Sequence, residues 1–173
     1  MEEGYGKQIF ELLNEAYKPL FGFSDLTDGQ ARMFLDSYLP FLNLDLVPVI
    51  FDPAGKMVGL AITMGSMTEA FQKSHGRLLP FGWFHLLKAL KFSHGDHAEL
   101  LLIAVRPDYQ GIGVTALIFE DLIPIYNRMH FTWAETGPQL ESNVKELSQW
   151  KSMTPKGYKR RRCYSKEITG NKK

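Results

Sequence analysis

The chain has a single cysteine, Cys163, among its 173 residues. One cysteine cannot form a disulfide bond within the chain, and no charged and then apolar leader precedes residue 20. Both observations favour a cytoplasmic location. An excess of charge of one sign is lacking too, because the formal net charge is +1. No global attraction toward nucleic acid or anionic lipid is therefore expected, although this value is compatible with a local basic patch.

Long apolar runs are also missing. The longest apolar region, residues 78–92, is interrupted by proline, glycine, histidine and two lysines, so no membrane-spanning segment is predicted. The sequence thus predicts neither a membrane nor a nucleic acid as partner. With 45% hydrophobic residues, the length favours a single domain over residues 1–173 with one substantial core.

The periodicity of apolar residues predicts an α/β fold with a mixed sheet. A first helix is expected from Ile9 to Tyr17, and Thr27 and Gln30 form a capping box before a second. Two strands, 47–51 and 57–64, are expected on either side of a turn at 52–55. Later elements are expected as strands at 99–105 and 131–135, a helix after residue 113, a helix at 141–152 and a strand pair near 158–168.

The stretch AVRPDYQGIGVTALIFE, from Ala104 to Glu120, predicts a strand, a glycine loop and a helix. Gly111 and Gly113 would let an anion approach the main chain at the start of the helix, where successive amide groups point outward. The pattern therefore indicates a phosphate-binding loop.

This segment resembles the acetyl-CoA-binding motif of the GNAT acyltransferase superfamily, whose pattern is Gln or Arg, two residues, Gly, one residue, and Gly or Ala. Thr115 stands where the family prefers Gly or Ala. The order of the expected elements is similar to the family's, as are Asn143, Trp150 and Gly157-Tyr158 near the end of the domain. The residues that carry the motif are Gln110, Gly111, Ile112, Gly113 and Val114.

The resemblance implies a GNAT-like fold that transfers an acyl group from acetyl-CoA, or from a longer acyl-CoA, to an amine, with no metal ion. The amides of Gly111 to Thr115 would hold the pyrophosphate. The pantetheine arm would lie beside the strand at Ile103, Ala104 and Val105, and Asn143 is a further expected cofactor-binding residue. The expected acceptor is a small-molecule amine or an amino-acid-like compound, and the expected state is a monomer or a homodimer.

Two features depart from the family. Only six residues, Met1 to Gly6, precede the first helical residues, which is too few for the family's first strand and its turn. Either that strand is absent, or the chain is the C-terminal part of a longer protein. Trp150 stands where many relatives have a tyrosine that protonates the departing thiolate, and an indole cannot serve as an acid.

Acyl transfer to an ammonium requires its deprotonation, which costs about 4 to 5 kcal/mol at pH 7. Glu99 and Glu135 are the candidate bases, and Glu135 is preferred because strands of open α/β sheets present functional groups at their carboxyl ends. The Val105 amide could meet the developing oxyanion. For either glutamate alone, a solvated strand end or a salt bridge is the commoner role.

Other functions stay open. The chain could be a non-catalytic acyl-CoA-binding or scaffold domain, or an RNA-binding module that uses residues 159–162, which could instead lie near the adenosine phosphate of CoA. His94, Asp96 and His97 resemble metal ligands, but a solvated turn is the favoured interpretation. The aromatic region 69–92 would form core, or it would wall the acceptor side of the cleft or a tunnel for an acyl chain longer than acetyl.

Overall fold

The computed structural model describes residues 3–91, 95–157 and 159–167. The chain divides into two compact units, Met1–Gly137 and Pro138–Lys173.

A four-stranded mixed sheet forms the centre of the first unit. Its order is β1 (Val49–Phe51), β2 (Met57–Gly65), β3 (His97–Val105) and β4 (Trp133–Thr136). β1 and β3 each pair antiparallel with β2, whereas β4 pairs parallel with β3. The α/β class and the expected β1–β2 hairpin are therefore confirmed.

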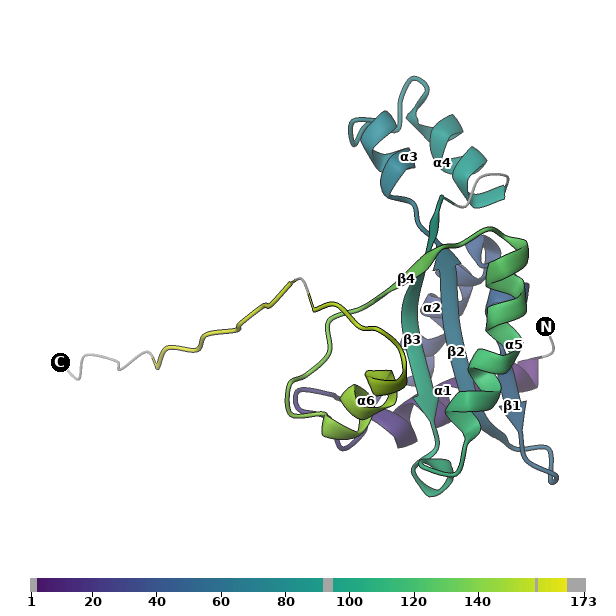
Figure 1. Cartoon of the computed structure of the whole chain (residues 1–173), viewed down its shortest axis with the longest axis vertical. Coiled ribbons are helices and arrows are strands. Elements are labelled where there is room, and N and C mark those ends of the chain that lie inside the picture. Colours follow the sequence, from purple (N-terminus) through teal and green to yellow (C-terminus); the bar gives the residue numbers. More distant parts are fainter. Residues whose placement is uncertain (1–2, 92–94, 158, 168–173) are drawn as a thin grey trace. The chain divides into compact units, whose positions relative to one another are not determined.

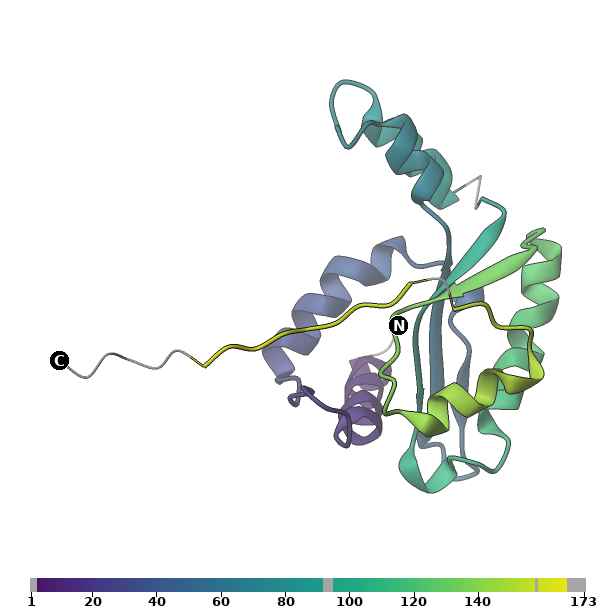
Figure 2. The same cartoon turned by 60° about the vertical axis from the view of Figure 1, so that its left-hand side comes forward.

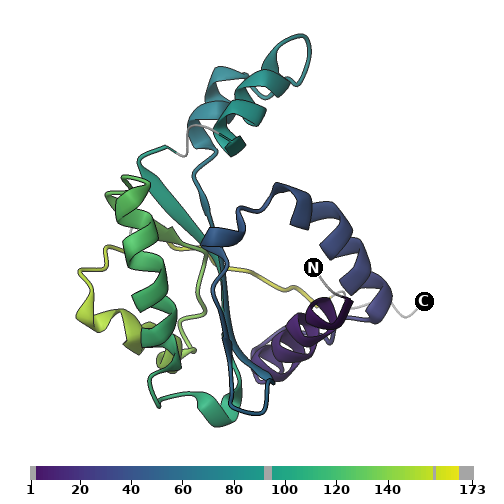
Figure 3. The ribbon, with the colours of Figure 1, turned by 90° about the vertical axis from the view of Figure 1, so that its right-hand side faces the viewer.

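Helices cover both faces of the sheet (Figure 3). α1 (Glu3–Tyr17) and α2 (Asp28–Tyr38) lie on one face, and α5 (Val114–Arg128) lies on the other. Leu12 and Leu13 of α1 pack against Leu60 and Ala104 of the sheet, whereas α5 buries one apolar stripe of its own. The short 3-10 helices are η1 (Leu39–Phe41), η2 (Leu44–Leu46) and η3 (Pro107–Tyr109).

The capping box expected in the N-terminal region is confirmed. Thr27 accepts a hydrogen bond from the amide of Gln30, and the Gln30 side chain accepts one from the amide of Thr27, so the capping box begins α2. Among the residues that the structure describes, α1 is the first element and no strand precedes it.

A helical hairpin is inserted between β2 and β3. It consists of α3 (Thr68–Lys73) and α4 (Gly82–Lys91), and it extends beyond the end of the sheet at which β2 finishes and β3 starts (Figures 1 and 2). The sequence predicts a partly helical region here but not two separate helices, because Pro80 and two glycines interrupt the periodicity of the apolar residues. A Cβ on Gly82 would lie 1.6 Å from the carbonyl oxygen of Arg77, so glycine is required where α4 begins.

The second unit contains α6 (Val144–Gln149) and η4 (Trp150–Ser152). Together they cover most of the helix expected at 141–152. The strand pair expected near 158–168 is wrong for the described part of that stretch, 159–167, where no strand is present. The run from Lys159 to Arg162 is exposed and has no alternating apolar face. Because a strand is stabilised mainly by packing of such a face, this run does not form one.

Gly59 sets how closely α5 approaches the sheet. A Cβ on this residue would lie 2.7 Å from Cγ1 of Val114 and 3.3 Å from Cβ of Ile50. Gly59→Ala should therefore lower the free energy of unfolding by about 1–3 kcal/mol, measured by urea denaturation, because overpacking displaces neighbouring side chains. Gly29→Ala is the matched control, since no atom lies within 4 Å of its Cβ position in α2. Equal stability of the Gly59→Ala variant and the wild type would contradict this account of the packing.

Candidate functional site

The glycine loop between β3 and α5 has the backbone conformation that the sequence predicts. Gly111 and Gly113 have φ of 80° and 99°, and Gly113 is the N-cap of α5. A Cβ on either glycine would meet no heavy atom within 4 Å, so glycine serves the backbone conformation here and not close packing. The first turn of α5 carries no acidic side chain, which leaves its positive end available to an anion.

Polar contacts fix the chain just before the loop. The Arg106 guanidinium forms a hydrogen-bonded ion pair with Asp108 and lies 3.6 Å from a carboxylate oxygen of Glu15. The hydrogen bond from Arg106 lowers the pKa of Asp108. Tyr109 donates its hydroxyl to Asp52 in the β1–β2 turn at 3.3 Å. These contacts hold the start of the loop against α1 and the β1–β2 turn.

The C-terminal half of β3 has one open edge. β4 pairs with β3 only from His97 to Leu100, so within the described chain no strand pairs with the β4 side of residues 101–105. Ile103 of β3 is paired with Ala61 of β2. The Ala61 amide donates to the carbonyl oxygen of Pro48 and therefore points away from β3. Because partners in an antiparallel pair face each other or both face away, the polar groups of Ile103 point to the open edge.

Two side chains reach the carbonyl groups of this edge. The Tyr17 hydroxyl donates to the Ile103 oxygen at 2.7 Å, and the Gln110 amide donates to the Val105 oxygen at 3.0 Å. Gln110, expected to bind cofactor, thus also ties the glycine loop to the end of β3. The contact of Tyr17 could not be predicted, because it joins residues 86 positions apart in the sequence.

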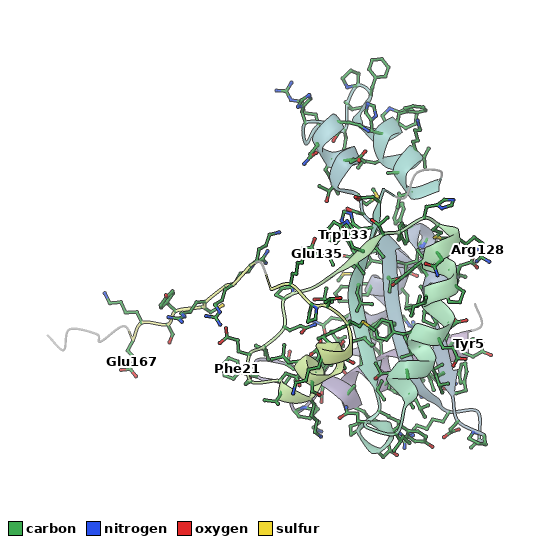
Figure 4. The ribbon with its side chains drawn as sticks, viewed as in Figure 1. Tyr5, Phe21, Arg128, Trp133, Glu135 and Glu167 are labelled. Carbon is green, nitrogen blue, oxygen red and sulfur yellow. The ribbon has the colours of Figure 1, made fainter. Side chains whose placement is uncertain are left out.

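The two candidate bases are brought together. Glu99 and Glu135 are register partners in the parallel pair of β3 and β4. Partners in such a pair carry their side chains on the same face, on backbones about 4.8 Å apart. Both residues are half-buried, and Figure 4 shows Glu135 at the hairpin end of the sheet. Two carboxylates on one face form an acidic spot that can attract an ammonium group.

A bulge and a hydroxyl group lie beside this acidic pair. Adjacent residues Ile62 and Thr63 of β2 are paired with Leu102 and Leu100, so Leu101 is an extra residue in β3. Such a bulge bends a strand locally. The buried Ser66 donates its hydroxyl to Glu99 at 2.8 Å and fixes the orientation of that carboxylate.

The geometry separates the two ends of β3. Val105 lies six positions after Glu99, which corresponds to about 20 Å along a strand. The Val105 amide is therefore too far from Glu99 to stabilise the oxyanion of a reaction in which Glu99 is the base. Val105 instead lies at the end of β3 next to the glycine loop, together with Ile103 and Ala104. This is where the pantetheine arm of an acyl-CoA is expected to run.

The remaining expected residues lie elsewhere. Asn143 caps α6: its side chain accepts from the Glu146 amide at 3.4 Å and donates to the Glu146 carboxylate at 2.7 Å, so any role toward a cofactor stays a prediction. Burial raises the pKa of Glu146. In the basic run, Arg160 forms an ion pair with Glu141 at 2.8 Å.

The suggested metal ligands have other partners. His97 contacts Asp96 at 2.7 Å and stacks on Trp133 with 3.8 Å between the ring centroids, and His94 lies outside the described residues. In the described part of the chain, no three His, Cys, Asp or Glu side chains gather as a metal ion would require.

Solved structures with the same arrangement include acetyltransferases. An aminoglycoside acetyltransferase from an uncultured soil metagenomic sample, in complex with sisomicin, superposes with a TM-score of 0.55 and 12% identity, covering 96% of this chain and 90% of that one. Glucosamine-6-phosphate N-acetyltransferase from Arabidopsis thaliana superposes with a TM-score of 0.53 and 14% identity, covering 93% of each chain. The chain has the GNAT fold.

Sequence comparison adds two curated relatives. A bacterial ceramide synthase from Caulobacter vibrioides is 30% identical over 102 residues, 59% of this chain and 26% of that protein. Protein YghO from Escherichia coli is 28% identical over 162 residues, 91% of this chain and 41% of that protein. The chain therefore spans less than half the length of either relative. No family model matches the chain.

A substitution in the glycine loop tests whether this loop binds the pyrophosphate of CoA. Gly113→Asp should weaken CoA binding at least 100-fold, measured by isothermal calorimetry, because a carboxylate would meet the pyrophosphate at the start of α5. Gly113→Ala is the matched control: it imposes the same strain at φ 99° without the charge and should lose far less affinity. Equal CoA affinity in the aspartate and alanine variants would contradict the assignment of the loop.

Proposed function

We propose that this chain catalyses acyl transfer from acyl-CoA to an amine. The observation that carries the proposal is a continuous path on one strand. The path starts at the glycine loop, follows the open edge of β3 past Val105 and Ile103, and ends beside Glu99 and Glu135. A phosphate site, an unpaired strand edge and two carboxylates are the three parts that the reaction needs.

Each part has a distinct role in the proposal. The amides of Gly111 to Thr115 hold the pyrophosphate, and the open edge accepts the pantetheine arm as an additional strand would be accepted. The thioester then lies near the bulge at Leu101, where β3 and β4 separate. Gln110 keeps the loop and the strand in register through its hydrogen bond to Val105.

The acceptor end uses the paired carboxylates. The acceptor arrives as an ammonium and is attracted by Glu99 and Glu135 together. Glu135 removes one proton, and the amine nitrogen forms a bond to the thioester carbon. The carbon–sulfur bond then breaks, and the departing thiolate takes the second proton from the nitrogen, so that the products are the amide and the free CoA thiol. Glu99, held by Ser66, orients the ammonium.

The name of one relative is in keeping with an amine acceptor. Ceramides are amides of long-chain amino alcohols, so a bacterial ceramide synthase forms the kind of bond proposed here. We therefore place long-chain amino alcohols beside small-molecule amines and amino-acid-like compounds among the acceptors to test. A cytoplasmic location, a monomeric or homodimeric state, and membership of a longer protein also belong to the proposal.

Ligand binding gives the first test. Acyl-CoA at 100 times its Kd should stabilise the folded chain by about 2.7 kcal/mol, which a thermal-shift series with CoA, acetyl-CoA and long-chain acyl-CoAs would detect. Release of the free CoA thiol in the presence of an amine panel would then measure turnover. Binding without turnover on any amine would favour the non-catalytic acyl-CoA-binding function, and absence of binding would contradict both functions.

The acidic pair gives the second test. Glu135→Gln should keep acyl-CoA affinity and lower kcat by about 10²- to 10⁴-fold at neutral pH, with partial recovery at high pH as neutral amine becomes abundant. Glu99→Gln should instead raise KM for the amine, because it removes one of two charges that attract the ammonium. The readout is initial rate against pH at saturating acyl-CoA.

A matched control separates these effects from a general loss of charge. Glu11→Gln removes an exposed carboxylate of α1 that pairs only loosely with Lys7, at 3.7 Å, and it should leave kcat and KM unchanged. If both active-site glutamine variants turn over at near-wild-type rates, the base is a different group.

A further inference from the structure

The α3–α4 hairpin exposes an unusual amount of apolar surface. Exposed apolar side chains of this size usually mark an interaction site when they are contiguous in a monomeric protein. The most exposed of them, Leu79 and Phe81, are 77% and 72% accessible, and both lie in the connection between the two helices. The exposed large apolar residues of the hairpin are Phe71, Leu78, Leu79, Phe81, Trp83, Phe84 and Leu87.

The same hairpin is cationic. From residue 70 to residue 91 the sequence has no Asp or Glu, but it has four lysines and arginines. Lys73, Arg77 and Lys88 are exposed among the apolar side chains, and Lys73 lies 3.0 Å from Glu69, the one carboxylate of α3. The whole chain is nearly neutral, so this charge is a local property of the hairpin.

A hollow in the hairpin gathers the basic groups. It has a volume of about 440 Å³, and its lining includes Lys73, His75, Arg77 and His85 together with the apolar Leu79 and Phe81. No acidic side chain lines it. Basic groups that surround a hollow with an apolar rim suit an anionic head group whose attached chains are apolar.

We propose that the α3–α4 hairpin docks this protein onto the surface of a lipid bilayer that contains anionic phospholipids. Leu79, Phe81 and Trp83 enter the boundary between head groups and acyl chains, and the basic hollow faces the lipid phosphates. Lys88 extends its stem along the apolar face while its ammonium group stays at the head groups.

Charge favours a bilayer over a second copy of the chain. A second copy of the chain would bring two cationic hairpins against each other, which like-charge repulsion opposes. A bilayer with anionic lipids satisfies the apolar residues and the cations at once. No described helix is long and apolar enough to cross a membrane, so the docking is at the surface.

The prediction from the sequence that the chain has no membrane partner depends on its net charge and on the lack of a spanning segment. Neither property bears on a local hairpin that is both apolar and cationic. The hairpin is connected to the sheet at Ser66, which bonds Glu99, so docking would bring the acidic pair to the bilayer side of the protein. The docking itself does not depend on the proposed acyl transfer.

Vesicle flotation tests the proposal. The wild-type chain should float with vesicles of phosphatidylcholine and phosphatidylglycerol, and much less with phosphatidylcholine alone. Leu79→Ser/Phe81→Ser should lower the partition coefficient about 10-fold or more, because two exposed apolar side chains are lost. Arg77→Glu/Lys88→Glu should abolish the preference for phosphatidylglycerol.

Phe21→Ser is the matched control, because Phe21 is 90% exposed and lies away from the hairpin (Figure 4). It should bind vesicles as the wild type does. Equal losses in the Phe21 variant and the Leu79/Phe81 variant would overturn the proposal, as would the absence of wild-type binding to phosphatidylglycerol vesicles. If the Leu79/Phe81 variant fails to fold, the Arg77/Lys88 variant tests the proposal by itself. An unchanged preference of that variant for phosphatidylglycerol would overturn the proposal.

Fluorescence gives a readout at a single residue. In a Trp133→Phe/Trp150→Phe background, Trp83 is the one remaining tryptophan of the chain. Its emission should shift to shorter wavelength with anionic vesicles and should be quenched by brominated lipid, and an unchanged spectrum would contradict insertion. Gly113→Asp should bind vesicles normally, so failure of the acyl-CoA site and failure of membrane docking are distinguishable.

Discussion

The separation of β3 from β4 is the constraint on which the candidate site depends. The two strands pair over only four residues, and β3 then continues for five more that lie along β2 on one side and pair with no described strand on the other. A buried strand edge without partners would leave amide and carbonyl groups unsatisfied, which proteins avoid. Here Tyr17 and Gln110 each donate a hydrogen bond to a carbonyl group of this edge, at Ile103 and Val105. An extended ligand with alternating donors and acceptors is the natural complement of such an edge.

The elements with strong local signals could be predicted from the sequence. The capping box at Thr27, the turn after Phe51 and the two glycines before α5 each act within a few residues, so their local chemistry fixes the backbone conformation. The GNAT-like fold is implied by the resemblance of the glycine-loop motif to that family, to which the order of the elements is also similar. The strand pair expected near 158–168 is wrong for the described residues 159–167, because a run of basic residues has no apolar face to bury.

The geometry of the candidate site could not be predicted in the same way. The sequence nominates Glu99 and Glu135 separately, but their adjacency depends on the register of two strands that are joined through α5. The bulge at Leu101 and the hydroxyl group of Ser66 are likewise products of tertiary pairing. The distance between Val105 and Glu99, by contrast, could have been predicted, because the strand expected at 99–105 already contains both residues and rises about 3.3 Å per residue.

The hairpin also has a consequence for how the chain can change. β2 and β3 are neighbouring antiparallel strands, and the simplest connection between such strands is a two-residue turn. Everything from Ser66 to Asp96 is thus an insertion at one connection of the sheet. Loop-closure entropy rises only slowly with length, so an insertion at this point can be lengthened, shortened or exchanged while the β2–β3 ladder keeps its register. The GNAT scaffold and the surface that it presents beyond this edge are in that sense separate modules, free to diverge at different rates.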